Sequence, residues 1–178
     1  MADNITIRTM TPDDCSLYRS LRLKSLADAP DAFGSTLAAE EAYPEQHWRS
    51  RLERAAVSDK DLPLLAFAAD VPVGLAWAKC DAAAPDVINL YQMWVDPGQR
   101  GQGIALAVLD SVVLWAKQRG ASVIQLGVAN GQEAAVRLYL KAGFTPSGLA
   151  EPLREGSPLL SQPMQLMLDP LSGDRRLH

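Results

Sequence analysis

The sequence predicts an α/β fold, and two stretches of its hydrophobic pattern support that prediction. The apolar run 87–95 has the length and the β-branched and aromatic content of a strand, and a turn and a helical pattern follow it. Earlier in the chain, apolar segments at 62–69 and 73–80 flank Val71 and Pro72, which we expect to form the tight turn of a hairpin. Strands that alternate with helices in this way are typical of a mixed sheet covered by helices.

The other elements follow from the same periodicities and from their boundary residues. Thr11 and Pro12 begin a helix, because a capping threonine and a proline in the first turn suit a helix N-terminus. A later helical region is expected to break at Pro44. In chain order, we expect a strand at 5–9, helices at 11–27 and after residue 36, a strand at 122–128, a helix at 132–142, and strands at 144–149 and 162–168.

Length and composition suit one domain. The chain has 178 residues, of which 48% are hydrophobic and 21% charged, so we expect a single domain over 1–178 with a flexible tail at 171–178. No apolar run approaches the roughly 20 residues of a membrane span, and residues 1–10 lack the apolar core of a signal peptide. Cys15 and Cys80 do not suggest a disulfide framework or a zinc site, so we expect a cytoplasmic protein without a bound metal and without a membrane partner.

The charge distribution argues against one class of partner. The net charge is −4, and no segment is rich in lysine and arginine. Because nucleic-acid binding depends on clustered positive charge, we expect no nucleic-acid partner. A small, positively charged substrate such as an amine fits this balance better.

The segment 100–105, R-G-Q-G-I-A, combines a glycine-containing turn with the start of a helix. The first N–H groups of a helix have no partner within it and lie at the positive end of its dipole, so they can bind phosphate. Gly101 and Gly103 have no side chains to keep a pyrophosphate away, and Arg100 is a candidate for a charge-assisted contact. By itself, such a pattern is more often a tight turn whose glycines serve only the backbone angles.

Two nucleotide-binding motifs do not fit this segment. The lysine and the serine or threonine of an ATP-binding P-loop do not follow the glycines. The third glycine and the distant acid of a dinucleotide-binding fingerprint are not in place either. ATP and NAD are therefore disfavoured as ligands.

Residues 100–105 also match the R/Q-x-x-G-x-G/A motif of the GNAT superfamily of acyl-CoA N-acyltransferases. The preceding residues 93–97, M-W-V-D-P, resemble the strand end that leads into this motif. Residues 135–144, A-V-R-L-Y-L-K-A-G-F, are similar to the family's A-x-x-L-Y-x-x-x-G-F segment. Two motifs in the right order and spacing make the resemblance specific. It is strongest over 87–148, and a weaker likeness extends over the N-terminal part.

The resemblance implies a particular α/β architecture of the α+β type, the GNAT fold. In that fold, a mixed and mostly antiparallel sheet of six or seven strands is flanked by about four helices. The fourth and fifth strands, here 87–95 and 122–128, are parallel neighbours that splay apart. Their unpaired backbone groups need partners, which the amide-bearing pantetheine arm of the cofactor supplies. The resemblance therefore implies acetyl-CoA as the acyl donor and a primary amine as the acceptor.

The cofactor contacts implied by the resemblance fall on three segments. N–H groups of the glycine turn are expected to bind the pyrophosphate, and an N–H at 93–95 is expected to stabilise the oxyanion of the reaction. Gln132 departs from the asparagine that relatives commonly carry there, and nearby Asn130 can share its role. The expected cofactor-binding residues are Met93, Trp94, Val95, Arg100, Gly101, Gln102, Gly103, Ile104, Ala105, Asn130, Gln132 and Tyr139.

Tyr139 occupies the tyrosine position of the second motif, which makes it our candidate general acid for the departing thiolate. A phenol with a pKa of about 10 can donate to a thiolate with a pKa of about 8.5 when it is well placed. Periodicity alone favours a packed tyrosine with a satisfied hydroxyl, and only the motif reverses that preference.

The general base is harder to assign. Many relatives carry a glutamate at the position of Asn89, and an amide cannot accept a proton. Glu41, with Glu40 beside it, is our candidate for a base that acts through water, although two adjacent acids on a helix are also typical of a solvated face. His47 is an alternative with less support, because a lone histidine is more often structural.

The acceptor is expected to enter beside the segment 33–48, which carries several acids. Carboxylates at a cleft mouth attract ammonium groups, so we expect a small cationic amine or an amino-acid-like amine. The expected acceptor-binding residues are Phe33, Glu40, Glu41 and Tyr91. Acetylation of a protein N-terminus or lysine and a catalytically silent CoA-binding module remain open, as do a monomer and a homodimer.

Overall fold

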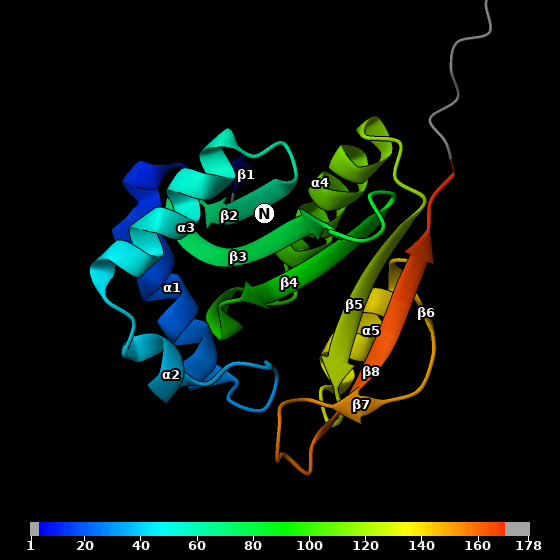
Figure 1. Ribbon diagram of the computed structural model, residues 1–178. Coiled ribbons are helices and arrows are strands. Elements are labelled where there is room, and N and C mark those ends of the chain that lie inside the picture. Colours follow the sequence, from blue (N-terminus) through cyan, green and yellow to red (C-terminus); the bar gives the residue numbers. More distant parts are fainter. Residues whose placement is uncertain (1–3, 170–178) are drawn as a thin grey trace, which may run out of the picture.

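Eight strands form one sheet in the computed structural model, which describes residues 4–169 (Figure 1). The strands are β1 (Ile5–Thr9), β2 (Asp61–Ala68), β3 (Val71–Cys80), β4 (Val87–Val95), β5 (Val123–Ala129), β6 (Thr145–Pro146), β7 (Glu151–Pro152) and β8 (Leu160–Met167). The helices are α1 (Cys15–Asp28), α2 (Leu37–Glu41), α3 (Glu45–Val57), α4 (Ile104–Gln118) and α5 (Glu133–Lys141). The expected tail at 171–178 lies outside the described residues.

The strand order confirms a mixed and mostly antiparallel sheet. The strands lie in the order β1-β2-β3-β4-β5-β8-β6, and β7 also pairs with β8. Within the described sheet, β4 and β5 form the one parallel pair. The sheet has eight strands rather than six or seven because it includes β6 and β7, which have two residues each. Five helices rather than about four arise because the region around Pro44 is divided into the short α2 and the longer α3.

Alternation along the strands divides the core between the two faces of the sheet. Leu64 packs in the cluster that includes α4 and α5, whereas its neighbour Leu65 packs in the cluster that includes α1 and α3. Successive strand residues point to opposite faces, so an apolar strand such as β2 can serve both clusters. The sheet therefore separates a face covered by α1 to α3 from a face covered by α4 and α5 (Figure 1).

The start of α1 follows the expected capping pattern. A single 3₁₀ turn at Pro12–Asp14 precedes the helix, and the Asp14 carboxylate accepts the Thr11 N–H at 2.7 Å. Both guanidinium NH groups of Arg8 donate to the same carboxylate at 2.8 Å, and these bonds hold the pKa of Asp14 below its usual value. Of the helices within residues 4–169, none combines the length and apolar character that a membrane crossing requires.

The β2–β3 hairpin turns at Ala69 and Asp70, so the expectation of a turn at Val71 and Pro72 was wrong. Ala69 and Asp70 have φ angles of 48° and 68°, the positive values that tight hairpin turns use to match the twist of the strands. Val71 and Pro72 instead begin β3. The proline marks the first residues of a strand here, and not the turn itself.

The expected strand at 144–149 is reduced to β6. Thr145 and Pro146 pair with β8, and the Ser147 N–H still donates to the Pro163 carbonyl at 2.9 Å. Pro163 has no N–H to return this bond, and the ladder ends here. The chain then turns through Gly148, which has a φ of 67°, before it reaches β7. The other expected elements lie within a few residues of those observed.

Candidate active site

The strands β4 and β5 pair over only three residues before they separate. Val87–Asn89 pair with Val123–Gln125, and beyond these residues the two strands form no further pairs with each other. Figure 1 shows the strands diverging from this point. Backbone N–H and C=O groups along both inner edges are thereby left without strand partners, and such groups require others. The observed sheet therefore contains the expected splayed pair.

The turn before α4 leaves the N-terminus of this helix open. Gly101 and Gly103 have φ angles of 80° and 83°, which residues with side chains rarely adopt. A Cβ atom added at either glycine would meet no atom within 4 Å, so the space beside the turn is clear. Gly103 is the N-cap of α4 and forms no side-chain capping bond. The first N–H groups of the helix are therefore available to an anion.

The guanidinium of Arg100 is held at the end of β4. Its Nε donates to the Val95 carbonyl at 3.0 Å, and a terminal NH group lies 3.0 Å from the Asp28 carboxylate. The same carboxylate accepts the Trp94 indole N–H at 2.9 Å. Arg100 and Trp94 thus fasten β4 to the end of α1. Because the Arg100 guanidinium already has these protein partners, its contact with a phosphate stays a prediction.

A β-bulge interrupts β4 just before its end. Two residues, Gln92 and Met93, lie opposite the single Ala76 of β3, because Trp77 pairs with Tyr91 and the next pair includes the residue after Met93. Gln92 has a φ of 60°, a conformation that costs on the order of 1 kcal/mol or more for a residue with a side chain. The extra residue of a bulge is unpaired. The bulge therefore frees backbone groups within the segment where an oxyanion-binding N–H was expected.

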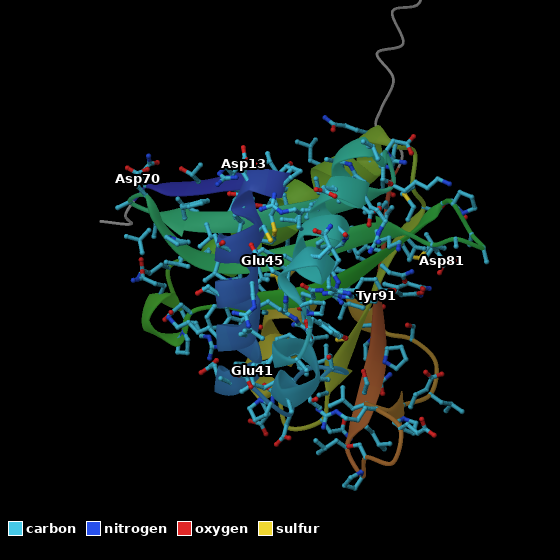
Figure 2. The ribbon with its side chains drawn as sticks, turned by 60° about the vertical axis from the view of Figure 1, so that its left-hand side comes forward. Asp13, Glu41, Glu45, Asp70, Asp81 and Tyr91 are labelled. Carbon is cyan, nitrogen blue, oxygen red and sulfur yellow. The ribbon has the colours of Figure 1, made fainter. Side chains whose placement is uncertain are left out.

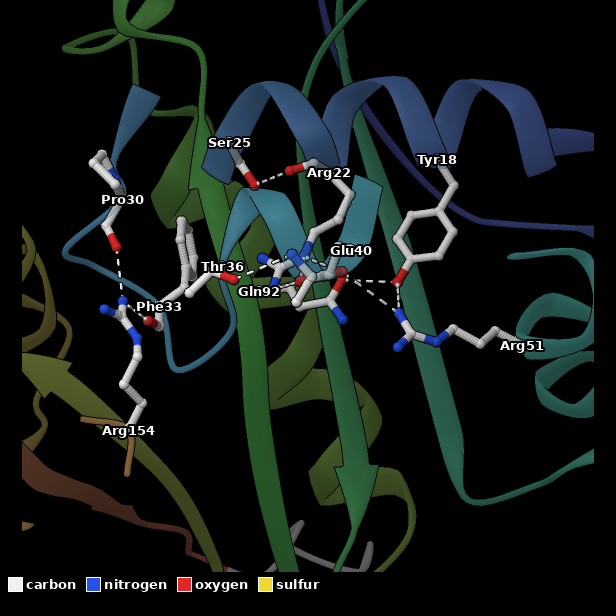
Figure 3. Close-up of polar contacts among 11 residues, drawn as sticks. Tyr18, Arg22, Ser25, Pro30, Phe33, Thr36, Glu40, Arg51, Gln92 and Arg154 are labelled. Carbon is white, nitrogen blue, oxygen red and sulfur yellow. Dashed lines mark hydrogen bonds and ion pairs between the residues drawn. The ribbon is translucent and has the colours of Figure 1, made fainter. Parts of the chain in front are cut away.

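Side chains from α1 and α3 hold Gln92 in this conformation (Figure 3). The Tyr18 hydroxyl donates to Gln92 Oε1 at 2.9 Å and accepts from the Arg51 guanidinium at 3.4 Å. Tyr18 is fully buried, and its ring packs edge-on against Trp48 with centroids 5.3 Å apart. Burial raises the pKa of the Tyr18 phenol, so the hydroxyl remains a donor at neutral pH. Tyr18 is thus placed to stabilise the strained bulge.

Tyr139 enters the core from α5. Its side chain is 7% exposed, and its ring meets Phe144 edge-on with centroids 5.6 Å apart. Burial raises the pKa of the Tyr139 phenol. The hydroxyl is therefore protonated at neutral pH, as a packed tyrosine and a proton donor both require.

Asn130 and Gln132 line a cavity of about 340 Å³ between the end of β5 and the start of α5. Gln132 is the N-cap of α5, and its side chain forms no capping bond. Asn130 is exposed. The structure therefore brings these two expected cofactor residues to one place, with amide groups that can contact a ligand.

Glu40 lies inside the helical layer and not at a solvated cleft mouth. Its side chain is 3% exposed, and its carboxylate accepts from Nε of Arg22 at 3.1 Å and from a terminal NH group at 2.7 Å (Figure 3). Arg51 lies 3.7 Å from the same carboxylate. A carboxylate shared by two arginines cannot attract a cationic acceptor, so the expected role of Glu40 was wrong. The pattern along α2 alone could not reveal arginines supplied by α1 and α3.

Glu41, next to Glu40 in sequence, is exposed on α2 (Figure 2). It lines neither the cavity beside Asn130 nor a second cavity beside Tyr91, so its role as a base stays a prediction without a supporting contact. His47 stacks on Tyr43 with ring centroids 4.1 Å apart, and burial lowers its pKa. Phe33 lies under the guanidinium of Arg22 at 4.8 Å, so it packs against a charge and does not offer a free apolar surface there.

A second cavity, of about 420 Å³, lies between α3 and the strands β3 and β4. Tyr91, Gln92, Trp77 and Tyr18 contribute to its lining, and Tyr91 is 51% exposed (Figure 2). Tyr91 follows the point where β4 leaves β5, and Gln92 is the bulged residue. The cavity is therefore next to the place where an acetyl group would lie if the splayed strands bound acetyl-CoA.

Asn89 contacts a carboxylate that sequence reasoning missed. Its Nδ2 donates to Asp81 Oδ2 at 3.0 Å, across the loop between β3 and β4. Hydrogen bonds from the Ala83 N–H, from Asn89 and from the Ala84 N–H hold the pKa of Asp81 below its usual value. An ionised carboxylate thus lies one hydrogen bond from the position where relatives carry a glutamate.

Tyr18 and Arg51 were also missed, and no local signal identifies them. Gln92 has a faint signal, because it is a polar residue directly before the apolar end of a strand. Its positive φ cannot be read from its type, since glutamine rarely adopts this conformation.

The divergence of β4 and β5 beside the open end of α4 defines the class of protein, an α/β acyltransferase fold. The model of the acetyltransferase (GNAT) family matches residues 24–144, which include both motifs. This match covers more than half of the chain, and the chain therefore belongs to the acetyltransferase (GNAT) family.

Curated relatives share moderate similarity with this chain. An uncharacterized N-acetyltransferase of Methanocaldococcus jannaschii is 25% identical over 144 residues, covering 78% of this chain and 60% of that protein. Mycothiol acetyltransferase of Thermobispora bispora is 28% identical over 150 residues, covering 82% of this chain and 48% of that protein. The chain thus spans less than two thirds of the length of either relative.

A solved structure shows the same fold nearly from end to end. The protein yncA from Salmonella typhimurium, solved with its cofactor acetyl-CoA, superposes with a TM-score of 0.77, and the superposition covers 98% of this chain and 99% of that chain. The two sequences are 19% identical, so the likeness concerns the fold alone.

Proposed function

We propose that this protein transfers an acetyl group from acetyl-CoA to the primary amine of a small molecule. The separation of β4 and β5 beside the open N-terminus of α4 is the observation that carries this proposal. The unpaired strand edges suit the amides of the pantetheine arm, because each amide can exchange hydrogen bonds with the backbone. The N–H groups at 101–105 suit the pyrophosphate. A simple phosphate ligand would need only the N–H groups at 101–105 and not the unpaired strand edges.

In this proposal, acetyl-CoA supplies the activated acyl group, and the residues of this chain orient it and move protons. A backbone N–H at the Gln92–Met93 bulge donates to the thioester oxygen as negative charge develops there. Tyr18 holds that bulge in place through Gln92. Tyr139 donates its phenolic proton to the departing sulfur.

The amine must lose one proton, and Asn89 cannot accept it. The ionised carboxylate of Asp81 accepts a hydrogen bond from the Asn89 amide, and after burial its charge helps to raise the pKa of the cavity residue Tyr91. It is therefore a more suitable terminus for a water-mediated transfer than the exposed Glu41. We therefore assign the proton to water and Asp81, with Asn89 orienting that carboxylate.

A thiol-release assay tests the proposal. Acetyl-CoA is incubated with the protein and a panel of small primary amines, and release of CoA is followed together with the mass of the acetylated product. We expect amine-dependent release for at least one member and a product heavier by one acetyl group. Binding of acetyl-CoA with no acetylated amine anywhere in the panel would contradict a small-molecule acetyltransferase.

Two other functions are separated by the same assay. Acetylation of a protein N-terminus or lysine would appear as turnover with peptides and not with small amines. The cavity of about 420 Å³ favours a small acceptor, since this volume is typical of small-molecule sites. A CoA-binding module without catalysis, which the missing glutamate at Asn89 would suit, would bind acetyl-CoA and release no thiol.

A further inference from the structure

The cavity beside the bulge has a charge opposite to that of the whole chain. Three cationic side chains, Arg51, Arg54 and Lys79, line it together with one carboxylate, Asp61, whereas the chain has a net charge of −4. Asp61 already accepts the Trp77 indole N–H at 2.9 Å. The lining is therefore suited to an anionic group and not to a second ammonium group.

The positive charge of this lining is only partly offset by nearby carboxylates. Asp61 lies opposite Lys79 in the β2–β3 pairing, and burial and then the charge of Asp81 raise the pKa of Tyr91. Between residues 4 and 169, neither Arg54 nor Lys79 forms an ion pair. Arg51 lies 3.7 Å from Glu40, but a second arginine shares that buried carboxylate, so positive charge remains in excess. The excess acts on His47, whose pKa is lowered by burial first and then by Arg51 and Arg54.

Part of the remaining lining is aromatic and lies on the strands β3 and β4. Tyr91 and Trp77 pair across β4 and β3, and Tyr91 is 51% exposed. Aromatic faces bind apolar stems well and also tolerate nearby cations. The cavity thus has a bulge at Gln92, an aromatic wall, and free cations at Arg54 and Lys79.

We propose that the acceptor is a small primary amine that carries an anionic group, a carboxylate or a phosphate, at the other end of a short apolar stem. This inference rests on the proposed function and names its acceptor class. The amine lies beside Gln92, the stem crosses Tyr91 and Trp77, and the anionic group binds Arg54 and Lys79. Charge-assisted hydrogen bonds to such a group are stronger than neutral ones.

Arg51, which is not assigned to the anionic group, helps the amine to react, because it contacts the Tyr18 hydroxyl that is bonded to Gln92. Nearby cations disfavour an ammonium ion and so lower the pKa of a bound amine. A larger fraction of the amine is then neutral, which partly offsets the lack of a carboxylate at Asn89. The neutral nitrogen forms the bond to the acyl carbon, and the carbon–sulfur bond breaks. The nitrogen gives one proton through water to Asp81, and Tyr139 protonates the sulfur and regains its proton from solvent.

Matched amines of similar length test the inference. Thiol release from acetyl-CoA is measured with aminobutyrate, aminopropylphosphonate, butylamine and putrescine, which end in a carboxylate, a phosphonate, a methyl group and a second amine. We expect kcat/KM for the carboxylate or the phosphonate to exceed that for butylamine by about tenfold or more, since each charge-assisted bond contributes roughly that factor. Putrescine should be the poorest acceptor. The better of the two anionic amines identifies the anionic group.

Arg54→Gln and Lys79→Gln test the assignment to this cavity. Each variant should reduce the ratio of kcat/KM for the preferred anionic amine to that for butylamine by about fivefold or more. Arg49→Gln is the matched control, because Arg49 lies on α3 but does not line the cavity. That variant should keep the wild-type ratio, and unchanged melting temperatures would show that all three variants fold.

The inference and the proposed function fail in different ways. Turnover that favours butylamine or putrescine, or ratios unchanged in both cavity variants, would overturn the inference and leave the small-molecule acetyltransferase intact. Turnover restricted to peptides, acidic ones included, would overturn the small-molecule function and this inference together. A preference for an anionic amine that Arg54→Gln and Lys79→Gln abolish supports both.

Discussion

Tyr139 combines a desolvated hydroxyl with a position in a family motif. Burial raises its pKa above the ordinary value of a phenol, so the hydroxyl is neutral across the physiological range. A weaker acid than usual gives up its proton less readily, but the donor form is always present. A permanently protonated hydroxyl is useful here, because the thiolate that takes the proton develops only in the transition state.

Tyr139→Phe should lower kcat by about 10²-fold and leave acetyl-CoA affinity within a few-fold, because the change removes only the hydroxyl. Steady-state kinetics and calorimetry measure the two effects. In the wild type, the raised pKa means that deprotonation of Tyr139 causes no loss of kcat below about pH 10. Wild-type turnover in the variant would show that Tyr139 only packs against Phe144.

Glu40 and Glu41 are adjacent in sequence, but Glu40 is buried in an ion pair with Arg22 and Glu41 is exposed. Glu40→Gln leaves Arg22 with a buried guanidinium that has lost its carboxylate, and we expect a loss of about 3–5 kcal/mol in the free energy of unfolding. Glu41→Gln changes an exposed side chain and should stay within about 0.5 kcal/mol of the wild type. Denaturant unfolding of both variants decides this. Equal stabilities would mean that the buried pair contributes nothing specific.

At the scale of elements, the bulge in β4 connects the helical layer to the site of chemistry. Gln92 has an unfavourable φ of 60°, and its side chain is bonded to Tyr18 of α1. Strain of this kind persists only where the surroundings hold it. The bulge is therefore maintained by α1 and α3 and not by the strand sequence alone.

Tyr18→Phe should reduce kcat by about fivefold or more while acetyl-CoA affinity changes little, because a looser bulge places its N–H less accurately. The measurement is kcat set against the calorimetric affinity for acetyl-CoA. A merely structural role would lower the melting temperature and the active fraction without changing kcat per folded molecule. Tyr43→Phe, on the α2–α3 connection, is a control that removes a hydroxyl without a bond to Gln92.

The N-terminus of α4 provides a second test at this scale. Gly103→Asp places a carboxylate at the N-cap, where a bound pyrophosphate would meet like charge, so acetyl-CoA affinity should fall by at least tenfold. Gly103→Ala adds the same backbone strain at a φ of 83° without the charge and should bind more tightly than the aspartate variant. Calorimetry with both folded variants measures this difference. Affinity unaffected by the aspartate would place the pyrophosphate elsewhere.

For the whole molecule, the short pairing of β4 and β5 divides the sheet into two parts that need other connections. Arg154, from the loop between β7 and β8, donates to the carbonyls of Pro30 and Phe33 at 2.9 Å in each case (Figure 3). The Leu153 carbonyl also approaches Gly34, where an added Cβ would meet it at 3.2 Å. These contacts join the α1–α2 loop to the part of the sheet that contains β8.

Arg154→Ala should loosen this connection without unfolding the protein. Hydrogen exchange of the amides at 29–36 should become faster by about tenfold, since the loop loses both of its bonds to Arg154, while amides of β2 and β3 keep their protection. Arg137→Ala, an exposed change on α5, serves as the control. Unchanged exchange at 29–36 would mean that Arg154 does not restrain the loop.

Local patterns were sufficient for most of the elements and for the cofactor motif. The apolar strand 87–95, the glycines at 101 and 103 and the capping residues at 11–14 determine structure through neighbours in sequence, so they can be recognised without a fold. The pattern placed the hairpin turn two residues too late, because proline indicates a turn more strongly than alanine does. The length of the strand expected at 144–149 was overestimated, because the end of β6 depends on its pairing with β8.

The sequence by itself determined the family, the alternation of strands and helices, and the open helix end at Gly103. The tertiary structure decided everything that depends on charges from distant segments. It buried Glu40 between Arg22 and Arg51, joined Tyr18 to Gln92, and gathered Arg51, Arg54 and Lys79 around one cavity. Backbone geometry at a motif follows from adjacent residues, whereas the electrostatics of a cavity depend on side chains that only the packing of helices on the sheet brings together.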